Sequence, residues 1–202
     1  MTNENVPKLR FKEFTGEWET VKLGEISQIT GGGTPSTDVQ EYWDGTINWY
    51  TPSEIGEDKY VSDSNRKITK KGLDHSSAKL LPEYTILLPT RATIGEMSII
   101  TKESTTNQGF QSVIVNENSN FEFIYYLLST LKKTLIKNAS GSTFLEISGK
   151  EIKKLKIKLP SLKEQEKIAN FLSKVDNKIS MIKEQLTNRE EFKKGLLQQM
   201  FV

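Results

Sequence analysis

The chain of 202 residues has no cysteine and only one histidine, His75. The lack of thiols excludes disulfides and thiolate metal sites, and a single imidazole excludes a multi-histidine metal site. His75 could still serve a Ser/His/Asp triad, although its neighbours Asp74 and Ser76 make a solvated loop the favoured interpretation.

Several other sequence features are also missing. There is no signal peptide and no apolar run of about 18 residues, so we expect a cytoplasmic protein without a membrane segment. The motifs H-E-x-x-H and G-x-S-x-G, a Walker pair and an adenosylmethionine-type glycine loop do not occur. These absences favour a binding module with no catalytic residue, metal or cofactor of its own, and leave an enzyme as a distant alternative.

Charge is small overall and unevenly distributed. The net charge is +2, but residues 150–202 carry +6 and residues 1–149 carry −4. A basic segment suits a DNA backbone and equally suits a solvated face, so charge alone does not decide between them. The lysines of the most basic segment, 132–158, are Lys132, Lys133, Lys137, Lys150, Lys153, Lys154, Lys156 and Lys158.

The strongest pattern is the helical stretch from Pro160 to Met200. Its apolar residues alternate in spacings of four and three, which is the seam of a coiled coil. Ser161 and Glu164 match a capping box at its start. No second stretch of the sequence has such a stripe, so a partner chain or an identical copy is expected to cover it. Arg189 and Lys193 continue the spacing, either as polar positions that set the register or as the end of the seam. The seam residues are Ile168, Leu172, Val175, Ile179, Ile182, Leu186, Leu196 and Met200.

The part before this helix combines short strands with one helix. Apolar spacing predicts a helix over 121–137, with a cap at Asn118, Ser119 or Asn120. Because the strands show no regular βαβ rhythm, the predicted class is α+β, or irregular α/β. Residues 1–15 are expected to be a tail that docks late or not at all. The predicted strands cover 18–23, 45–51, 85–89, 94–101, 111–115 and 152–159.

Three loops carry groups suited to nucleic acid. In the first, Gly31–Gly33 would free the backbone for positive φ and for contact with a phosphate, although a plain surface turn is also consistent. The others, 90–95 and 105–110, are rich in side chains that pair with base edges. Trp49 and Phe110 are better suited to the core than to base stacking.

An ordered set of phrases resembles the specificity (S) subunits of type I restriction-modification enzymes and spans residues 16–202. The most specific phrase is Leu159-Pro160-Ser161-Leu162-Lys163-Glu164-Gln165-Glu166-Lys167-Ile168-Ala169, followed by Leu172, Asp176 and the coiled-coil repeat. The earlier phrases are Leu23-Gly24-Glu25-Ile26 after Trp18, Gly32-Gly33-Thr34-Pro35-Ser36, Gly45-Thr46-Ile47-Asn48-Trp49, Ser76-Ser77-Ala78-Lys79-Leu80-Leu81-Pro82, Arg91-Ala92-Thr93-Ile94-Gly95, Thr106-Asn107-Gln108-Gly109-Phe110 and Ser140-Gly141-Ser142-Thr143.

The resemblance implies a target recognition domain over residues 16–158 and a conserved long helix over 159–202, after the tail 1–15. In this family the domain reads one half of a split target in double-stranded DNA, and the helix is a spacer and a docking surface for methyltransferase (M) subunits. The M subunits supply adenosylmethionine and adenine methylation, and a motor-nuclease (R) subunit joins through them.

The chain departs from the family pattern because a typical S subunit has two domains and two helices packed antiparallel. We therefore expect a homodimer, formed as an antiparallel coiled coil through the seam, that reads a palindrome split by a non-specific spacer. Whether the half-length chain is natural or a truncation stays open. The alternative function is a coiled-coil adaptor or decoy without DNA binding, which the −4 charge of residues 1–149 favours slightly.

Candidate DNA contacts come from the loops, with lysines of the expected 150–158 strand serving the phosphates. The candidates are Thr34, Ser36, Thr37, Arg66, Lys70, Arg91, Thr93, Ser142 and Thr143.

Overall fold

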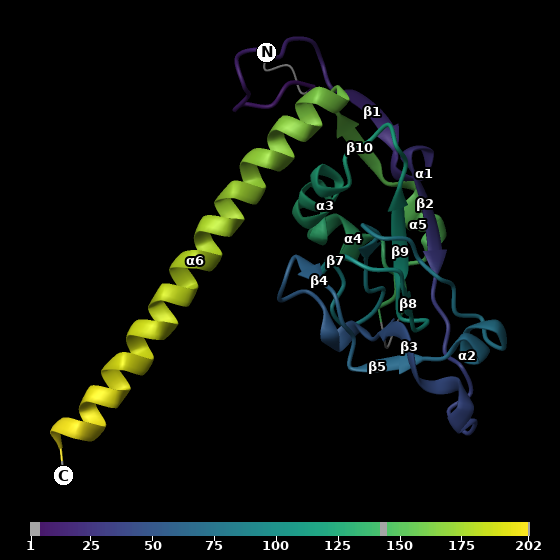
Figure 1. Ribbon diagram of the computed structural model, residues 1–202. Coiled ribbons are helices and arrows are strands. Elements are labelled where there is room, and N and C mark those ends of the chain that lie inside the picture. The colour runs from purple at the N-terminus through teal and green to yellow at the C-terminus, as the bar shows by residue number, and fades with distance from the viewer. Residues whose placement is uncertain (1–4, 142–144, 202) are drawn as a thin grey trace.

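The computed structural model describes residues 5–141 and 145–201 and consists of a globular domain from which one long helix extends (Figure 1). The helix, α6, leaves the domain beside the β1–β10 ribbon, and its C-terminal half runs clear of the other elements (Figure 1). The helices are α1 (Leu23–Ile26), α2 (Lys70–Asp74), α3 (Phe121–Thr130), α4 (Lys132–Lys137), α5 (Gly149–Lys154) and α6 (Leu162–Met200), with short 3-10 turns η1 (Gln40–Tyr42) and η2 (Pro52–Glu54). The strands are β1 (Glu19–Lys22), β2 (Ser27–Gly31), β3 (Trp43–Tyr50), β4 (Tyr60–Val61), β5 (Arg66–Ile68), β6 (Ile86–Leu87), β7 (Ser98–Ile100), β8 (Ser104–Thr106), β9 (Gln111–Val115) and β10 (Lys156–Leu159).

The strands form three sheets of mixed direction. A five-stranded sheet has the order β2-β9-β6-β7-β4, a three-stranded sheet the order β5-β3-β8, and β1 pairs with β10. Most pairs are antiparallel, whereas β4 runs parallel to β7 and β3 runs parallel to β8. The mixed architecture with a long C-terminal helix confirms the predicted class.

The main core lies between the five-stranded sheet and the helices α3, α4 and α5. Ile86, Ile99 and Val113 from the sheet are fully buried, as is Leu128 from α3. The start of α3 is fixed as predicted, since the Asn120 side chain accepts a hydrogen bond from the Phe123 N–H at 2.9 Å. Trp49 and Phe110 are buried, which confirms them as core residues.

Three predicted elements are wrong in detail. The strand expected over 94–101 is limited to β7, because Ile94 and Gly95 lie in a turn. The helix expected over 121–137 is interrupted at Leu131, whose ψ of 10° departs from helical geometry. The strand expected over 152–159 begins only at Lys156, because residues 149–154 form α5. Ser148 caps α5 by accepting a hydrogen bond from the Glu151 N–H, and Ile152 is fully buried. The pattern of Ser148 followed by Glu151, which is typical of a helix start, therefore outweighs the alternation of apolar residues and lysines that predicts a strand.

The first turn of α6 is anchored by contacts other than the expected capping box. Ser161 makes no side-chain cap, and the Glu164 carboxylate instead accepts bonds of 2.7 Å from Nε and Nη2 of Arg10. The buried Gln165 amide donates to the Pro160 carbonyl and accepts from the Asn120 N–H, both at 2.9 Å. The start of α6 is thus held by groups distant in the sequence.

The N-terminal segment docks on α6, contrary to part of the tail prediction. Arg10 binds Glu164, and the ring of Phe11 packs edge-on against Phe171 with centroids 5.9 Å apart. Leu9, between these contacts and Pro7, is 92% exposed. Among the residues that the structure describes, no helix is apolar over a length sufficient to cross a membrane.

Candidate nucleic-acid interface

The glycine loop is held against the domain by two buried tryptophans of β3. The indole N–H of Trp49 donates to the Gly33 carbonyl at 2.9 Å, and that of Trp43 donates to the Ser36 carbonyl at 3.0 Å. The two rings meet edge to face with centroids 5.1 Å apart. Ser36 and Thr37 remain exposed at the surface of this rigid support.

Close backbone packing, not positive φ, explains the glycines of this loop. None of Gly31–Gly33 has a positive φ, so that expectation is wrong. A Cβ at Gly32 would lie 2.2 Å from the Asn107 carbonyl oxygen, and one at Gly33 would lie 2.4 Å from the Ala78 nitrogen. The Gly33 N–H donates to the Thr106 carbonyl at 2.8 Å and is therefore not available to a phosphate.

We expect Gly33→Ala to destabilise the domain by several kcal/mol, because the added methyl meets backbone atoms that cannot move away. The measurement is the denaturant midpoint followed by circular dichroism. Gly195→Ala is the control: its Cβ meets nothing within 4 Å, so in the exposed helix it should stabilise by about 1 kcal/mol. Equal stability of Gly33→Ala and the wild type would contradict the close-packing explanation.

Arg66 on β5 lies on the aromatic support of the glycine loop. Its guanidinium carbon is 3.6 Å from the centroid of the Trp43 ring and 5.6 Å from that of Trp49. Stacking orients the plane of the guanidinium, and in the part of the chain that the structure describes no acceptor occupies its N–H groups. An oriented, unoccupied guanidinium is suited to bidentate contact with a guanine edge.

Lys70 lies at the start of α2, which packs on η1. The Thr69 N–H donates to the Tyr42 carbonyl at 2.9 Å, and the Tyr42 ring stacks on His75 with centroids 5.7 Å apart. Lys70 pairs with Asp74 one turn along, an exposed ion pair that water weakens. Lys70 can therefore exchange this partner for a phosphate.

Arg91 and Thr93 lie in the loop between β6 and β7. Arg91 Nη2 is 3.0 Å from a carboxylate oxygen of Glu146, and the Thr93 hydroxyl is buried without a hydrogen-bond partner among the described residues. Arg91 and Lys132 border one surface hollow of about 930 Å³. Ser142 and Thr143 lie outside the described residues.

The loop 105–110 joins these groups into one surface. Thr34 Oγ1 donates to Gln108 Oε1 at 2.5 Å on one side, and the Thr90 N–H donates to the Gly109 carbonyl at 2.9 Å on the other. We name the surface formed by residues 31–37, Arg66, Lys70 and residues 90–93 and 105–110 the loop edge. Its elements β3, β5 and α2 lie at the end of the domain opposite the β1–β10 ribbon (Figure 1).

The sequence predicts the residue types of the loop edge, but it does not predict two residues that hold its side chains in place. Gln108 binds Thr34, and Trp43 lies beneath Arg66. The amide-rich phrase around Gln108 is visible in the sequence, whereas nothing local links Trp43 to Arg66.

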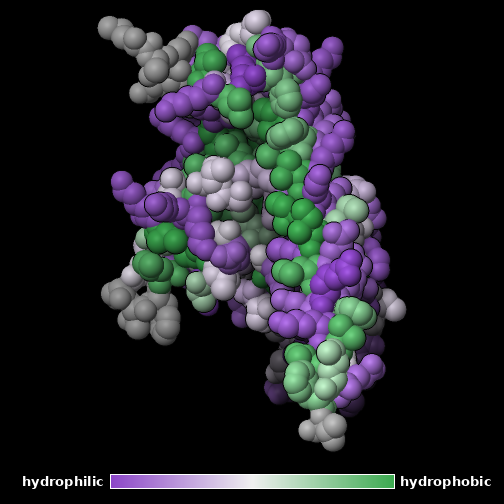
Figure 2. Space-filling model, turned by 90° about the vertical axis from the view of Figure 1, so that its left-hand side faces the viewer, coloured by the Kyte–Doolittle hydropathy of each residue, from purple (hydrophilic) through white to green (hydrophobic). Residues whose placement is uncertain are grey.

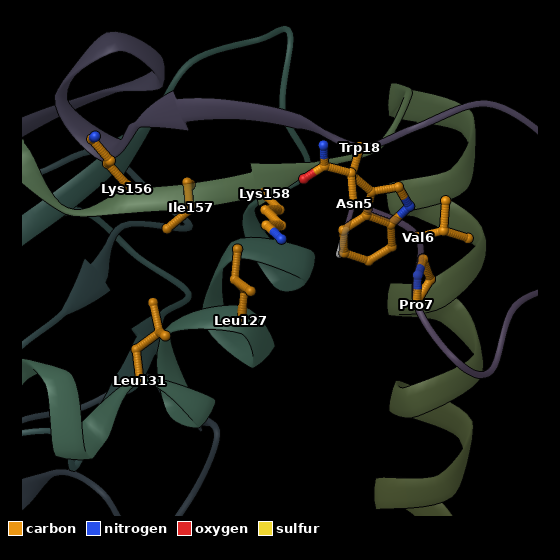
Figure 3. A pocket seen from close by; sticks show the side chains of 9 residues that line it. All are labelled: Asn5, Val6, Pro7, Trp18, Leu127, Leu131, Lys156, Ile157 and Lys158. Atoms are coloured by element: carbon orange, nitrogen blue, oxygen red, sulfur yellow. The ribbon is translucent and has the colours of Figure 1, made fainter. Parts of the chain in front are cut away.

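The lysines of 150–158 lie outside the segments of the loop edge, although α5 begins near it: a Cβ at Gly149 would lie 2.6 Å from Gln111, the strand partner of Gly31. Lys150, Lys153 and Lys154 belong to α5, and Lys156 and Lys158 to β10. Figure 3 shows Lys156 and Lys158 beside a hollow that Trp18, Leu127 and Leu131 also line. These lysines are not part of the loop edge.

The seam of α6 forms a second candidate surface. Ile168 and Leu172 are partly buried near the N-terminal segment, and exposure reaches 71% at Met200. Figure 2 shows the resulting apolar strip running along α6. An exposed apolar stripe of this length is typical of a helix that pairs with another chain.

Comparisons with known proteins agree on one family. Residues 15–189 match the family model described as the type I restriction modification DNA specificity domain. The chain is 38% identical over 190 residues to the MjaIX specificity subunit of Methanocaldococcus jannaschii, covering 92% of this chain and 44% of that one. It is 33% identical over 192 residues to the EcoR124I/EcoR124II specificity subunit of Escherichia coli, covering 92% of this chain and 47% of that one.

Two solved structures share the fold. One, titled as the structural basis of complex assembly and conformational transition of the type I R-M system, aligns with a TM-score of 0.67 at 20% identity and covers 85% of this chain and 41% of that chain. The other, the HsdS subunit from Thermoanaerobacter tengcongensis, gives a TM-score of 0.63 at 16% identity and covers 85% and 40%. The chain thus spans about half the length of the curated relatives it matches.

Proposed function

The chain belongs to the type I restriction-modification DNA specificity family, and from this premise we propose that it is a non-catalytic subunit that reads one half of a split DNA target. The observation that carries the proposal is the loop edge, where hydrogen bonds join the loops of Thr34 and Thr90 to the segment 105–110 and Arg66 lies on the tryptophans that hold the glycine loop. The family match does not favour the alternative of an adaptor without DNA binding.

We assign the parts of the chain to three roles. Residues 16–158 would be the recognition domain and residues 159–202 the spacer helix, after an N-terminal segment whose residues Arg10 and Phe11 contact that helix. M subunits would supply adenine methylation, and R subunits would join through them. DNA recognition of this kind would take place in the cytoplasm.

We further propose that α6 pairs antiparallel with α6 of a second copy. One register matches every seam position: Ile182 faces Leu186, Leu172 faces Leu196, and Ile168 faces Met200 of the partner. Arg189 and Lys193 then face Ile179 and Val175, and their aliphatic stems can cover these residues while the charges reach water. At 1.5 Å per residue the two Ile168 positions lie about 48 Å apart along the coil.

Lys70→Ala tests the loop edge as the DNA face. Loss of one phosphate contact should weaken specific and non-specific DNA alike, and should reduce the slope of log affinity against log salt by about one unit per subunit. The measurement is fluorescence anisotropy of the complex with M subunits on target and scrambled duplexes over a salt series.

Lys154→Ala is the matched control, because Lys154 also forms an exposed ion pair within one turn, with Glu151, but lies on α5. Its salt slope should equal that of the wild type. A reduced slope for Lys154→Ala with no change for Lys70→Ala would move the DNA face from the loop edge to the surface of α5.

A further inference from the structure

A polar cluster joins the domain to α6 well beyond the first turn of that helix. Lys59, in the segment before β4, donates from Nζ to Glu122 Oε1 at 2.6 Å, Tyr126 Oη at 2.8 Å and Ser173 Oγ at 2.7 Å. Glu122 and Tyr126 belong to α3, and Ser173 belongs to α6. We name Lys59, Glu122, Tyr126, Ser173 and Asp176 the brace.

The brace is closed by further bonds. Ser173 Oγ donates to Glu122 Oε1 at 2.6 Å, and the Tyr126 hydroxyl donates to Asp176 on α6. The Tyr60 hydroxyl adds a third bond to Glu122 Oε1, at 2.6 Å. The bonds that Lys59 donates to Glu122, Tyr126 and Ser173 use all three N–H groups of its ammonium. A fully bonded cluster of this kind has a single well-defined arrangement.

Burial makes this cluster different from the surface ion pairs of the domain. The Lys59 and Glu122 side chains are only 13% and 17% exposed. Burial lowers the pKa of Lys59, but hydrogen bonds to Glu122 and Tyr126 outweigh it and leave the pKa raised. For Glu122 the signs are reversed: burial raises the pKa of the carboxyl group. Hydrogen bonds from Lys59, Ser173 and Tyr60 outweigh this effect and leave the pKa lowered. Both groups thus stay charged around neutral pH.

The brace contacts α6 at a point where it can restrict the direction of that helix. The first anchor of α6, at Glu164 and Gln165, lies about 12 Å before Ser173 along the helix. Between them Ala169 is buried in the main core and Phe171 packs on Phe11, so the brace is the outermost of several contacts that fix the direction of α6. From Asn177 to Met200 every residue of α6 except Gly195 is exposed, so within the described chain the brace is the last point of support.

We propose that Lys59 is a positioning residue: through Glu122 and Ser173 it fixes the angle between the recognition domain and α6, and thereby the spacing at which two half-sites are read. Hydrogen bonds are directional, so those of the brace restrict the orientation of α6 relative to α3 and the segment before β4. The inference rests on the proposed function for its consequence in DNA, but the angle itself can be measured without DNA.

Lys59→Met tests the angle by a distance between two spin labels. The chain has no cysteine, so Glu83→Cys on the domain and Lys194→Cys on α6 can be labelled without background, and excess unlabelled protein removes distances between copies. Lys194 lies about 31 Å beyond Ser173, so a pivot of about 10° moves it by about 5 Å. We expect a narrow distance distribution in the parent protein and a distribution shifted or broadened by about this amount in Lys59→Met.

Two further variants separate positioning from folding. Ser173→Ala removes the α6 side of the brace without removing a charge, and it should broaden the distribution even if Lys59→Met folds poorly. Lys67→Met removes an exposed ion pair with Asp63 of 2.9 Å and should leave the distribution unchanged. Unchanged distances in both folded brace variants would overturn the proposal.

The consequence in DNA is read from the methylated motif. With M subunits present, the brace variants should keep the bases of each half-site but lose methylation at the native spacing or spread it over neighbouring spacings. A shifted distance with an unaltered motif would overturn the spacing role. A wild-type complex that methylates no DNA would overturn the proposed function and the spacing role with it, while the distance measurement still decides the angle.

Discussion

Ile182→Glu is expected to convert the protein from a dimer to a monomer. In the proposed register Ile182 lies next to the twofold axis and faces Leu186 of the partner, so one substitution removes an apolar contact twice. Each lost side-chain burial weakens association by about 1.5–3 kcal/mol, and bringing two unpaired carboxylates into the seam adds to this. Together these effects raise the dissociation constant by roughly 10³-fold or more.

Sedimentation velocity over a concentration series measures this effect, and Met181→Glu provides the control. Met181 is 62% exposed on the same helix but lies outside the seam, so its variant should sediment as the wild type does. Monomeric wild-type protein at high micromolar concentration would refute homodimer formation. Equal association of both variants would place the interface on another face.

Loss of the dimer should also abolish methylation of the split target, since a monomer contacts one half-site only. The domain itself should remain folded, because Ile182 is 54% exposed and touches nothing in the core. A variant that loses pairing but keeps its circular dichroism and thermal midpoint would therefore connect the seam to DNA recognition directly.

The features that the sequence predicts are those encoded by local patterns. The seam of α6 repeats over many turns, and Asn120 lies immediately before an amphipathic helix, so periodicity and capping identify both. The helix α5 has only six residues, too few for a periodic signal, and Ile152 also fits the alternation of the strand that follows. The local sequence pattern therefore predicts a strand where the chain forms a helix.

Contacts between distant residues account for the rest. Arg10 lies 154 residues before Glu164, and a bidentate guanidinium contact is stronger than the bond that a capping box would give. Similarly, the parallel pairing of Asn48 with Ser104 is what carries the loop 105–110 toward the glycine loop. Residue types at the loop edge could be predicted, but their grouping depends on this pairing.

Arg66→Ala is expected to change both halves of the recognised motif at once. In a homodimer one gene supplies both recognition domains, so a lost base contact is lost at symmetric positions on the two strands. Each lost bidentate contact relaxes discrimination by about 1–3 kcal/mol, so the two half-sites together lose about 2–6 kcal/mol, roughly 30-fold to 10⁴-fold. Methylome sequencing of cells that carry each variant with the M subunits gives the measurement.

Lys67→Ala is the control for this variant, because Lys67 is the next residue on β5, and successive side chains of a strand lie on opposite faces. It should leave the motif unchanged. An Arg66→Ala motif relaxed in one half only would mean that a different chain reads the other half, which contradicts the homodimer while keeping Arg66 as a reader. An unaltered motif would remove Arg66 from base recognition. Because these outcomes differ in symmetry as well as in size, one experiment tests both the reader and the dimer.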